Sequence, residues 1–202
     1  MAATSLLDVV DLNKSCEEAR GSFLPSKLVD PDYLDGRPRA IAQMLAGMFA
    51  SCVLDIRHLD SGGGNGVLSR ALFAAGWNST SYDPFVDGPL STGMGRFNLV
   101  TSFEVFEHVP DVNILISTLS SLVEEDGMVL FSTLLSDGIF ARNQRLNWWY
   151  ASPRNGQLSL SSRRSLELPG EKEMFKLANR SANLHAYWRD IPSWAADVFK
   201  PA

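Results

Sequence analysis

Several residue types that would place this chain in a special class are scarce or absent. Cysteine occurs twice, at Cys16 and Cys52, with neither a CxxC spacing nor a Cys/His cluster, which argues against a structural zinc site and a disulfide framework. No apolar run approaches the ~18 residues of a membrane span, and the N-terminus has no basic stretch followed by an apolar core. We therefore expect a cytoplasmic protein that holds no metal and does not associate with a membrane.

A large excess of charge of either sign is absent as well. The chain carries 18 Lys and Arg and 23 Asp and Glu, for a net charge of −5, and it has no basic run. This balance gives no broad electrostatic surface for nucleic acid, so we expect no nucleic-acid partner. The small basic cluster Arg163-Arg164 is more typical of a solvated helix start than of a phosphate site. Nothing in the composition indicates an oligomeric state.

Length and hydrophobic content fit one globular domain. Hydrophobic residues make up 45% of the 202 residues and charged residues 20%, which is ordinary for a soluble protein with a sizeable core. Residues 1–35 are weakly patterned and end in the turn-rich Asp30-Pro31-Asp32 and Asp35-Gly36. We expect an N-terminal leader or cap over 1–35 and a single domain over 36–202.

What the chain does contain is a glycine-rich segment, Leu59-Asp60-Ser61-Gly62-Gly63-Gly64-Asn65-Gly66, followed by an acidic residue at Asp83. Glycines at 62, 64 and 66 are typical of a tight turn between a strand and a helix. Without a Cβ, such a turn lets backbone N–H groups and a helix N-terminus approach a nucleotide-like ligand closely. The loop is therefore the candidate ligand site.

Strand and helix signals alternate along the chain around this loop. Apolar periodicity predicts helices over 38–49, 67–75 and 112–123, and apolar runs predict strands over 52–59, 79–82, 97–103 and 128–135. A turn is expected at Asp126-Gly127, and two further strands, 174–178 and 184–188, flank an Asn/Ser turn. This order predicts an α/β fold of the doubly wound, Rossmann-like kind. It has a mostly parallel sheet, helices on both faces and a C-terminal antiparallel strand pair.

Two cofactor classes use a strand, a glycine loop, a helix and an acid at the end of the next strand. Dinucleotide sites need G-x-G-x-x-G, whereas the spacing here is G-x-G-x-G with Asp60 ahead of it. An aspartate beside the loop suits a ligand with an amino group and a sulfonium better than one with two phosphates. The carboxylate of Asp83 can accept hydrogen bonds from both ribose hydroxyls. The pattern therefore favours S-adenosylmethionine (SAM).

Four ordered segments resemble class I SAM-dependent methyltransferases, over roughly residues 50 to 190. A fifth run, which follows them, resembles the small bacterial type 23 branch. The five segments are LDSGGGNG at 59–66, YDP at 82–84, FEVFEHV at 103–109, DGMVL at 126–130 and WWYASPRNG at 148–156.

The resemblance implies roles for individual residues near the cofactor. Gly66 closes the glycine loop, and Phe103 and Glu104 would line the pocket near the reactive methyl group. Pro84 would pack beside the adenine and Asp83 would hold the ribose. The methionine part would be surrounded by Asp60, Ser61, Gly62 and Gly64.

The resemblance also implies a catalytic and a substrate region. His108 or Glu104 would assist as the base if the acceptor is a hydroxyl, with His108 alternatively a partly exposed helix-start residue. Trp149 and Arg154 would face the substrate. The alternatives without substrate contact are packing in the core or in a lid for Trp149, and hydrogen bonding to backbone carbonyls for Arg154.

The sequence departs from the family pattern in two places. Only 13 residues separate Asp83 from Phe97, so the third strand and its adenine-binding acid are expected to be reduced or absent, with Asp87 a weak stand-in. Gln157 stands where relatives often place a histidine.

The leading hypothesis is a SAM-dependent methyltransferase that moves a methyl group to an oxygen, nitrogen or carbon of a small-molecule acceptor by in-line displacement. The two departures motivate an alternative, a SAM-binding regulatory or partner subunit without transfer activity. A nicotinamide-dependent oxidoreductase is a third hypothesis, which the glycine spacing disfavours.

Overall fold

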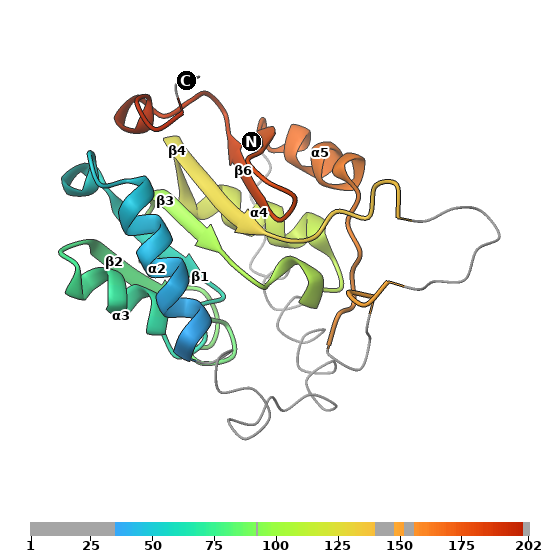
Figure 1. The fold of residues 1–202 in the computed structure, drawn as a ribbon, viewed down its shortest axis with the longest axis horizontal. Helices are drawn as coiled ribbons and strands as arrows, with labels where there is room; N and C mark the ends of the chain where they lie inside the picture. Colours follow the sequence, from blue (N-terminus) through green and yellow to red (C-terminus); the bar gives the residue numbers. More distant parts are fainter. Residues whose placement is uncertain (1–34, 92, 140–147, 152–155, 200–202) are drawn as a thin grey trace.

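Six strands form one sheet in the order β2-β1-β3-β4-β6-β5 (Figure 1). The computed structural model describes residues 35–91, 93–139, 148–151 and 156–199. The first four strands of this order pair in parallel, and β6 pairs antiparallel with both β4 and β5. The strands are β1 (Arg57–Ser61), β2 (Asn78–Tyr82), β3 (Phe97–Ser102), β4 (Val123–Ser132), β5 (Lys176–Asn179) and β6 (Leu184–Trp188). The predicted fold class is confirmed.

Helices cover both faces of the sheet, as predicted (Figure 1). One apolar cluster joins α2 and α3 to the sheet face that carries Leu99 and Met128. The other joins α4 and α5 to the face that carries Val100 and Val129, so residues that alternate along a strand enter opposite cores. The helices are α2 (Arg37–Met48), α3 (Val67–Ala74), α4 (Val112–Leu122) and α5 (Arg163–Lys172), with 3-10 turns η2 (Val53–Asp55), η3 (Phe106–His108) and η5 (Ser193–Ala195).

Two predicted boundaries were wrong. The strand expected over 52–59 begins only at Arg57, because Val53–Asp55 forms the η2 turn and leaves Leu54 exposed. The turn expected at Asp126-Gly127 lies inside β4, which starts at Val123 and shifts register against β3 between its two ends. Between the pairs Phe97–Val123 and Leu99–Met128, β4 advances by five residues and β3 by two, so the turn-forming residues lie in an irregular part of β4 that does not end the strand.

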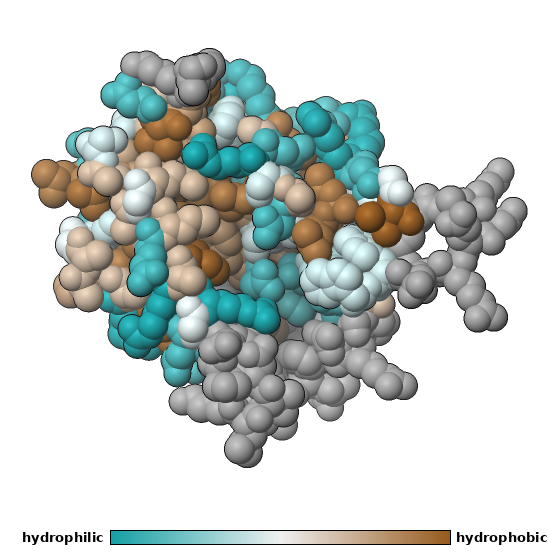
Figure 2. Space-filling view, in the orientation of Figure 1, coloured by the Kyte–Doolittle hydropathy of each residue, from teal (hydrophilic) through white to brown (hydrophobic). Residues whose placement is uncertain are grey.

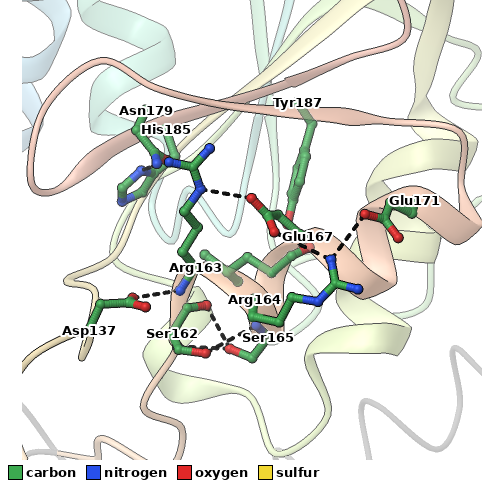
Figure 3. Close-up of polar contacts among 11 residues, drawn as sticks. Asp137, Ser162, Arg163, Arg164, Ser165, Glu167, Glu171, Asn179, His185 and Tyr187 are labelled. Carbon is green, nitrogen blue, oxygen red and sulfur yellow. Dashed lines mark hydrogen bonds and ion pairs between the residues drawn. The ribbon is translucent and has the colours of Figure 1, made fainter. Parts of the chain in front are cut away.

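Of helix α5 only the start at Arg163-Arg164 was expected, and no helical span was predicted after it, because Pro169 and Gly170 lie inside the helix. Its start is stabilised by a capping box, in which the side chains of Ser162 and Ser165 each bond the other's backbone (Figure 3). The Asp137 carboxylate also accepts a 2.6 Å hydrogen bond from the Arg163 backbone N–H.

The exposed side of α5 is charged. Arg163 pairs with Glu167, and Arg164 contacts both Glu167 and Glu171 (Figure 3). The expectation that Arg163-Arg164 is a solvated helix start is confirmed, and Figure 2 shows hydrophilic residues, in teal, gathered over this helix. Among the described residues, no helix has both the length and the apolar character needed to cross a membrane.

Candidate functional site

The order of the strands reverses at β1, since β2 lies on one side of it and β3 on the other. In open α/β sheets, ligands usually bind in the crevice beyond the carboxyl ends of the strands at such a reversal, which here are β1 and β3. A cavity of about 160 Å³ opens there, between the loop after β1 and the segment after β3. It is lined by Arg37, Pro38, Ile41, Asp60, Gly62, Gly63, Gly64, Asn65, Val67, Leu68, Phe103 and Glu104.

The glycine loop needs its glycines for two physical reasons. Gly62, Gly64 and Gly66 have φ values of 82°, 53° and 69°, the left-handed region that other L-residues rarely adopt. A Cβ on Gly62 would also lie 2.5 Å from a Val105 methyl group. Gly66 is the N-cap of α3, and a Cβ there would lie 2.7 Å from the Ser81 hydroxyl.

Asp60 is the penultimate residue of β1, and its carboxylate lies inside the protein. Only 4% of the residue is exposed, and Oδ1 accepts a 3.0 Å hydrogen bond from the Thr101 hydroxyl. Oδ2 faces the loop, where a Cβ on Gly63 would lie 2.4 Å from it. Burial, together with the nearby Asp83 charge, raises the pKa of Asp60 to about 7, against the opposing effect of the Thr101 hydrogen bond. Its neighbour Ser61 is buried and is not among the lining residues.

Asp83 lies just past β2 and is bonded to the glycine loop itself. Its Oδ2 accepts a 2.9 Å hydrogen bond from the Gly64 N–H, and its Oδ1 accepts one of 2.8 Å from the Phe85 N–H. Each carboxylate oxygen has a second lone pair for a ligand hydroxyl. Asp83 and the adjacent Pro84 lie outside the lining of the cavity, at the side toward β2.

The stretch between Asp83 and Phe97 contains no strand among its described residues, as expected from its length. β2 is therefore the edge of the sheet. The carboxylate of Asp87, the weak stand-in for an adenine-binding acid, accepts a 2.8 Å hydrogen bond from the Asp83 N–H. Asp87 thus holds the loop that presents Asp83.

Phe103 and Glu104 reach the cavity from the carboxyl end of β3. Glu104 has φ 56°, which is uncommon for a residue with a side chain and typical of functional sites. Its N–H donates a 2.9 Å hydrogen bond to the Ser132 hydroxyl, which in turn lies 3.4 Å from a Glu104 carboxylate oxygen. Ser132 thus orients the glutamate from the neighbouring strand β4.

His108 lies in the η3 turn before α4, and α4 itself is capped by Asp111. The imidazole is half-buried, and its Nδ1 is 2.8 Å from the Gly156 carbonyl oxygen. A carbonyl only accepts, so Nδ1 carries a proton, and Nε2 is the ring nitrogen that this hydrogen bond leaves for a substrate. The Glu107 carbonyl binds the Leu158 and Ser159 N–H groups, which holds the Gly156 segment beside His108.

Of the two predicted substrate residues, the structure describes Trp149, which is not among the residues that line the cavity. Trp149 is 77% exposed and packs edge-on against Tyr150, with ring centroids 5.6 Å apart. Arg154 lies outside the described residues. Tyr150 is buried, with its hydroxyl 3.4 Å from the Thr133 hydroxyl.

Sequence reasoning missed the contribution of α2. Arg37, Pro38 and Ile41, from the first turns of this helix, form one wall of the cavity. The periodicity of α2 predicted a helix and carried no signal for the surface that its N-terminus would cover. Gly63 and Asn65 of the glycine loop, for which the sequence predicted no role, also line the cavity.

The charged groups around the cavity fit the amino-acid end of SAM. The Asp60 carboxylate matches an ammonium group and the Arg37 guanidinium matches a carboxylate. Glycine backbone between them leaves room that side chains would fill, since Gly64 has no neighbour within 4 Å of its Cβ position. No group of three or more His, Cys, Asp or Glu side chains is arranged for a metal ion within the described residues.

Comparison with known proteins points to methyl transfer. A family model described as a methyltransferase domain, type 23, matches residues 33–173. The ubiquinone biosynthesis O-methyltransferase of Actinobacillus pleuropneumoniae serotype 7 is 30% identical over 145 aligned positions, and the match covers 58% of each chain. That of Colwellia psychrerythraea is 30% identical over 139 aligned positions, and the match covers 56% of each chain. The matches thus span less than two thirds of the length of these curated relatives.

Solved structures share the fold at low sequence identity. Streptomyces venezuelae DesVI superposes with a TM-score of 0.55 at 13% identity, covering 94% of this chain and all of that one. The magnesium protoporphyrin IX methyltransferase of Synechocystis, with bound SAH, superposes with a TM-score of 0.50 at 14% identity, covering 88% and 94%.

Proposed function

Because the chain belongs to the class I SAM-dependent methyltransferases, we propose that it transfers a methyl group from SAM to a hydroxyl of a small-molecule acceptor. The observation that carries the proposal is that Asp60, Arg37 and Glu104 line the same cavity, beside the glycine loop. The names of the curated relatives, which are O-methyltransferases, favour oxygen over nitrogen or carbon as the accepting atom.

The proposed cofactor contacts follow from charge and reach. Asp60 would bind the amino group, Arg37 the carboxylate and Asp83 the ribose hydroxyls, with Phe103 as an apolar wall. When bound, SAM supplies a methyl group on a sulfonium, which is already a good leaving group. The protein's main task is therefore to align the acceptor, and positioning of this kind contributes on the order of 7 to 11 kcal/mol in ideal cases.

His108 is the proposed base for the acceptor hydroxyl. Its Nδ1–H is committed to the Gly156 carbonyl, so Nε2 is the atom that accepts a proton. Glu104 lines the cavity itself and is the second candidate, held by Ser132. Both groups lie on the segment that follows β3, at the same edge of the sheet as the glycine loop.

Methyl transfer is tested with labelled SAM and a panel of phenols, catechols and amines. We expect product from a hydroxyl acceptor, and His108→Gln should lower kcat by roughly 10² to 10⁴ without changing SAM affinity. Glu104→Gln tests the other base in the same assay. Wild-type kcat in His108→Gln would remove His108 from the mechanism, and product from amines alone would contradict the hydroxyl acceptor.

The ribose contact is tested separately by calorimetry. Asp83→Ala should weaken SAM binding by roughly 10- to 100-fold, because hydrogen bonds to a charged group contribute about 1.5 to 3 kcal/mol each. Circular dichroism should show an intact fold. Asp190→Ala, an exposed aspartate at the far edge of the sheet, is the matched control and should bind SAM normally. Unchanged affinity in Asp83→Ala would mean that the ribose lies elsewhere.

A SAM-binding subunit without transfer activity is the second candidate. It is favoured by the lack of a strand between β2 and β3 in the described residues, and by Gln157 in place of a histidine. The same panel separates the two candidates. SAM binding without product from any acceptor supports the binding role, and turnover with any acceptor excludes it.

A further inference from the structure

A second histidine lies close to the site without reaching the cavity. His58 is fully buried in β1, two residues before Asp60, at a position where parallel strands covered on both faces ordinarily carry an apolar side chain. A buried imidazole loses its hydration and needs hydrogen-bond partners. Its partners therefore indicate what the histidine is for.

Both ring nitrogens of His58 are bonded across the sheet. Nδ1 lies 2.7 Å from the Ser79 hydroxyl on β2, and Nε2 lies 2.9 Å from the Thr101 hydroxyl on β3. The parallel register sets Ser79 opposite His58 and Thr101 opposite Asp60. Since the Thr101 hydroxyl also bonds Asp60 Oδ1, four side chains form one chain from the edge strand to the cavity carboxylate.

The number of protons on these four side chains fixes which group donates and which accepts in each hydrogen bond. An ionised Asp60 only accepts, so Thr101 uses its single proton on Asp60 and must accept from His58 Nε2–H. Burial lowers the pKa of His58 to about 3, so the ring is neutral and its other nitrogen accepts from the Ser79 hydroxyl. Every proton in the chain then points toward the Asp60 carboxylate.

The carboxylate at the end of this chain is surrounded by charge of both signs. Burial raises the pKa of Asp60, the Thr101 hydrogen bond lowers it, and the charge of Asp83, just past β2, raises it further. Arg37 of α2 and Glu104 after β3 share the cavity with it. The donor that reaches Oδ1 is therefore one of few groups that favour the ionised form.

The ring of His58 is also held in place from its own side of the sheet. Trp77 packs edge-on against it, with ring centroids 6.0 Å apart and planes at 85°. Such a contact restricts the imidazole to the orientation that serves both Ser79 and Thr101.

We propose that His58 is a positioning residue for cofactor binding, which acts through Thr101 to orient the Asp60 carboxylate and keep it ionised. It thereby sets the pH range in which the chain binds SAM. This inference rests on the proposed role of Asp60 as the partner of the SAM amino group. A histidine that served only to fill the core would have no such effect on binding.

The test measures the dissociation constant of SAM by calorimetry from pH 5.5 to pH 9. Thr101→Val removes the donor at nearly constant volume, and His58→Leu removes the group behind it. Both should move the pH midpoint of binding upward by about one unit, which gives about fivefold weaker binding at pH 7, about tenfold weaker binding at pH 6 and near wild-type affinity at pH 9. Titration of the ligand's own amino group is common to all variants and cancels in the comparison.

Two controls separate positioning from packing. His58→Gln keeps one donor and one acceptor and should restore the wild-type midpoint. His185→Leu removes the matched buried imidazole of β6, which bonds Asn179 and Thr133, and should lower thermal stability with no change in the midpoint.

The possible outcomes are distinct. A wild-type pH profile in both Thr101→Val and His58→Leu overturns the inference while leaving the cofactor site in place. Asp60→Asn should bind SAM more weakly and lose the Asp60-dependent midpoint. If Asp60→Asn binds SAM as tightly as the wild type at every pH, the proposed cofactor site itself is wrong.

Discussion

The Asp60 carboxylate is almost fully buried at the wall of the cavity, with Oδ1 bonded by the Thr101 hydroxyl and Oδ2 facing Gly63. Burial of an ionised carboxylate lowers stability unless donors compensate for the lost hydration. The Thr101 hydroxyl donates a hydrogen bond to Asp60 from a side chain, whereas the two oxygens of Asp83 are each bonded by a backbone N–H. The two aspartates therefore have different environments. Burial raises the pKa of Asp60 to about 7, whereas backbone N–H groups hold the carboxylate of Asp83.

Asp60→Asn should raise stability at alkaline pH. The native pKa is raised from 3.8 to about 7, so the favourable contribution of the protonated group is complete below pH 3.8 and is lost as the pH rises through 7. At pH 8 the variant should unfold with a free energy about 1 to 3 kcal/mol higher than the wild type, and this gain should vanish near pH 4. Urea unfolding at both values measures it. Equal stability at pH 8 would show that the charge is well solvated in the native state.

At the scale of elements, α5 packs on the sheet with a close contact to β6. Gly170 faces the ring of Tyr187, and a Cβ there would lie 2.8 Å from a ring carbon. The Tyr187 ring has little freedom to move away from such a Cβ. It stacks with Phe131 and with Phe175, and its hydroxyl donates a 2.7 Å hydrogen bond to the Leu166 carbonyl. Figure 3 shows Tyr187 directed at the helix from the sheet.

Two glycine substitutions in helices should therefore have opposite signs. Alanine in a helix interior is favoured over glycine by about 1 kcal/mol, and overpacking a core costs about 1 to 3 kcal/mol. Gly47→Ala in α2, where nothing lies within 4 Å of the Cβ position, should stabilise the protein. Gly170→Ala should destabilise it by about 1 to 2 kcal/mol. Urea unfolding of both variants decides this, and a stabilising Gly170→Ala would show that Tyr187 yields.

At the scale of the whole molecule, the cavity is built from parts that are far apart in the sequence. The N-terminus of α2, the loop after β1 and the segment after β3 contribute its walls. A ligand that bridges them binds only the folded state and stabilises it by mass action.

SAM and its demethylated product should therefore raise the melting temperature, and NAD should not. At about 100 times its Kd a ligand contributes about 2.7 kcal/mol, which is roughly 5 to 11 °C for a domain of this size. Differential scanning fluorimetry with the three ligands measures the shift. Stabilisation by NAD alone would show that the glycine loop binds a dinucleotide and not SAM.

Local patterns by themselves determined the glycine turn, its two aspartates and the periodicity of α2, α3 and α4. These features depend on residues close together in the chain, where backbone sterics and one-sided burial act directly. The prediction that the stretch after Asp83 lacks a strand had the same basis, since 13 residues leave little room for one.

Only the tertiary structure decided which residues meet. Arg37 joins Asp60 because α2 packs over the end of β1, and His58 is linked to Asp60 because the register of β3 sets Thr101 between them. Helix α5 forms despite Pro169 because Leu166 and Gly170 pack against Tyr187. Strand register and helix docking depend on contacts between distant segments, which the order of residues along the chain does not display.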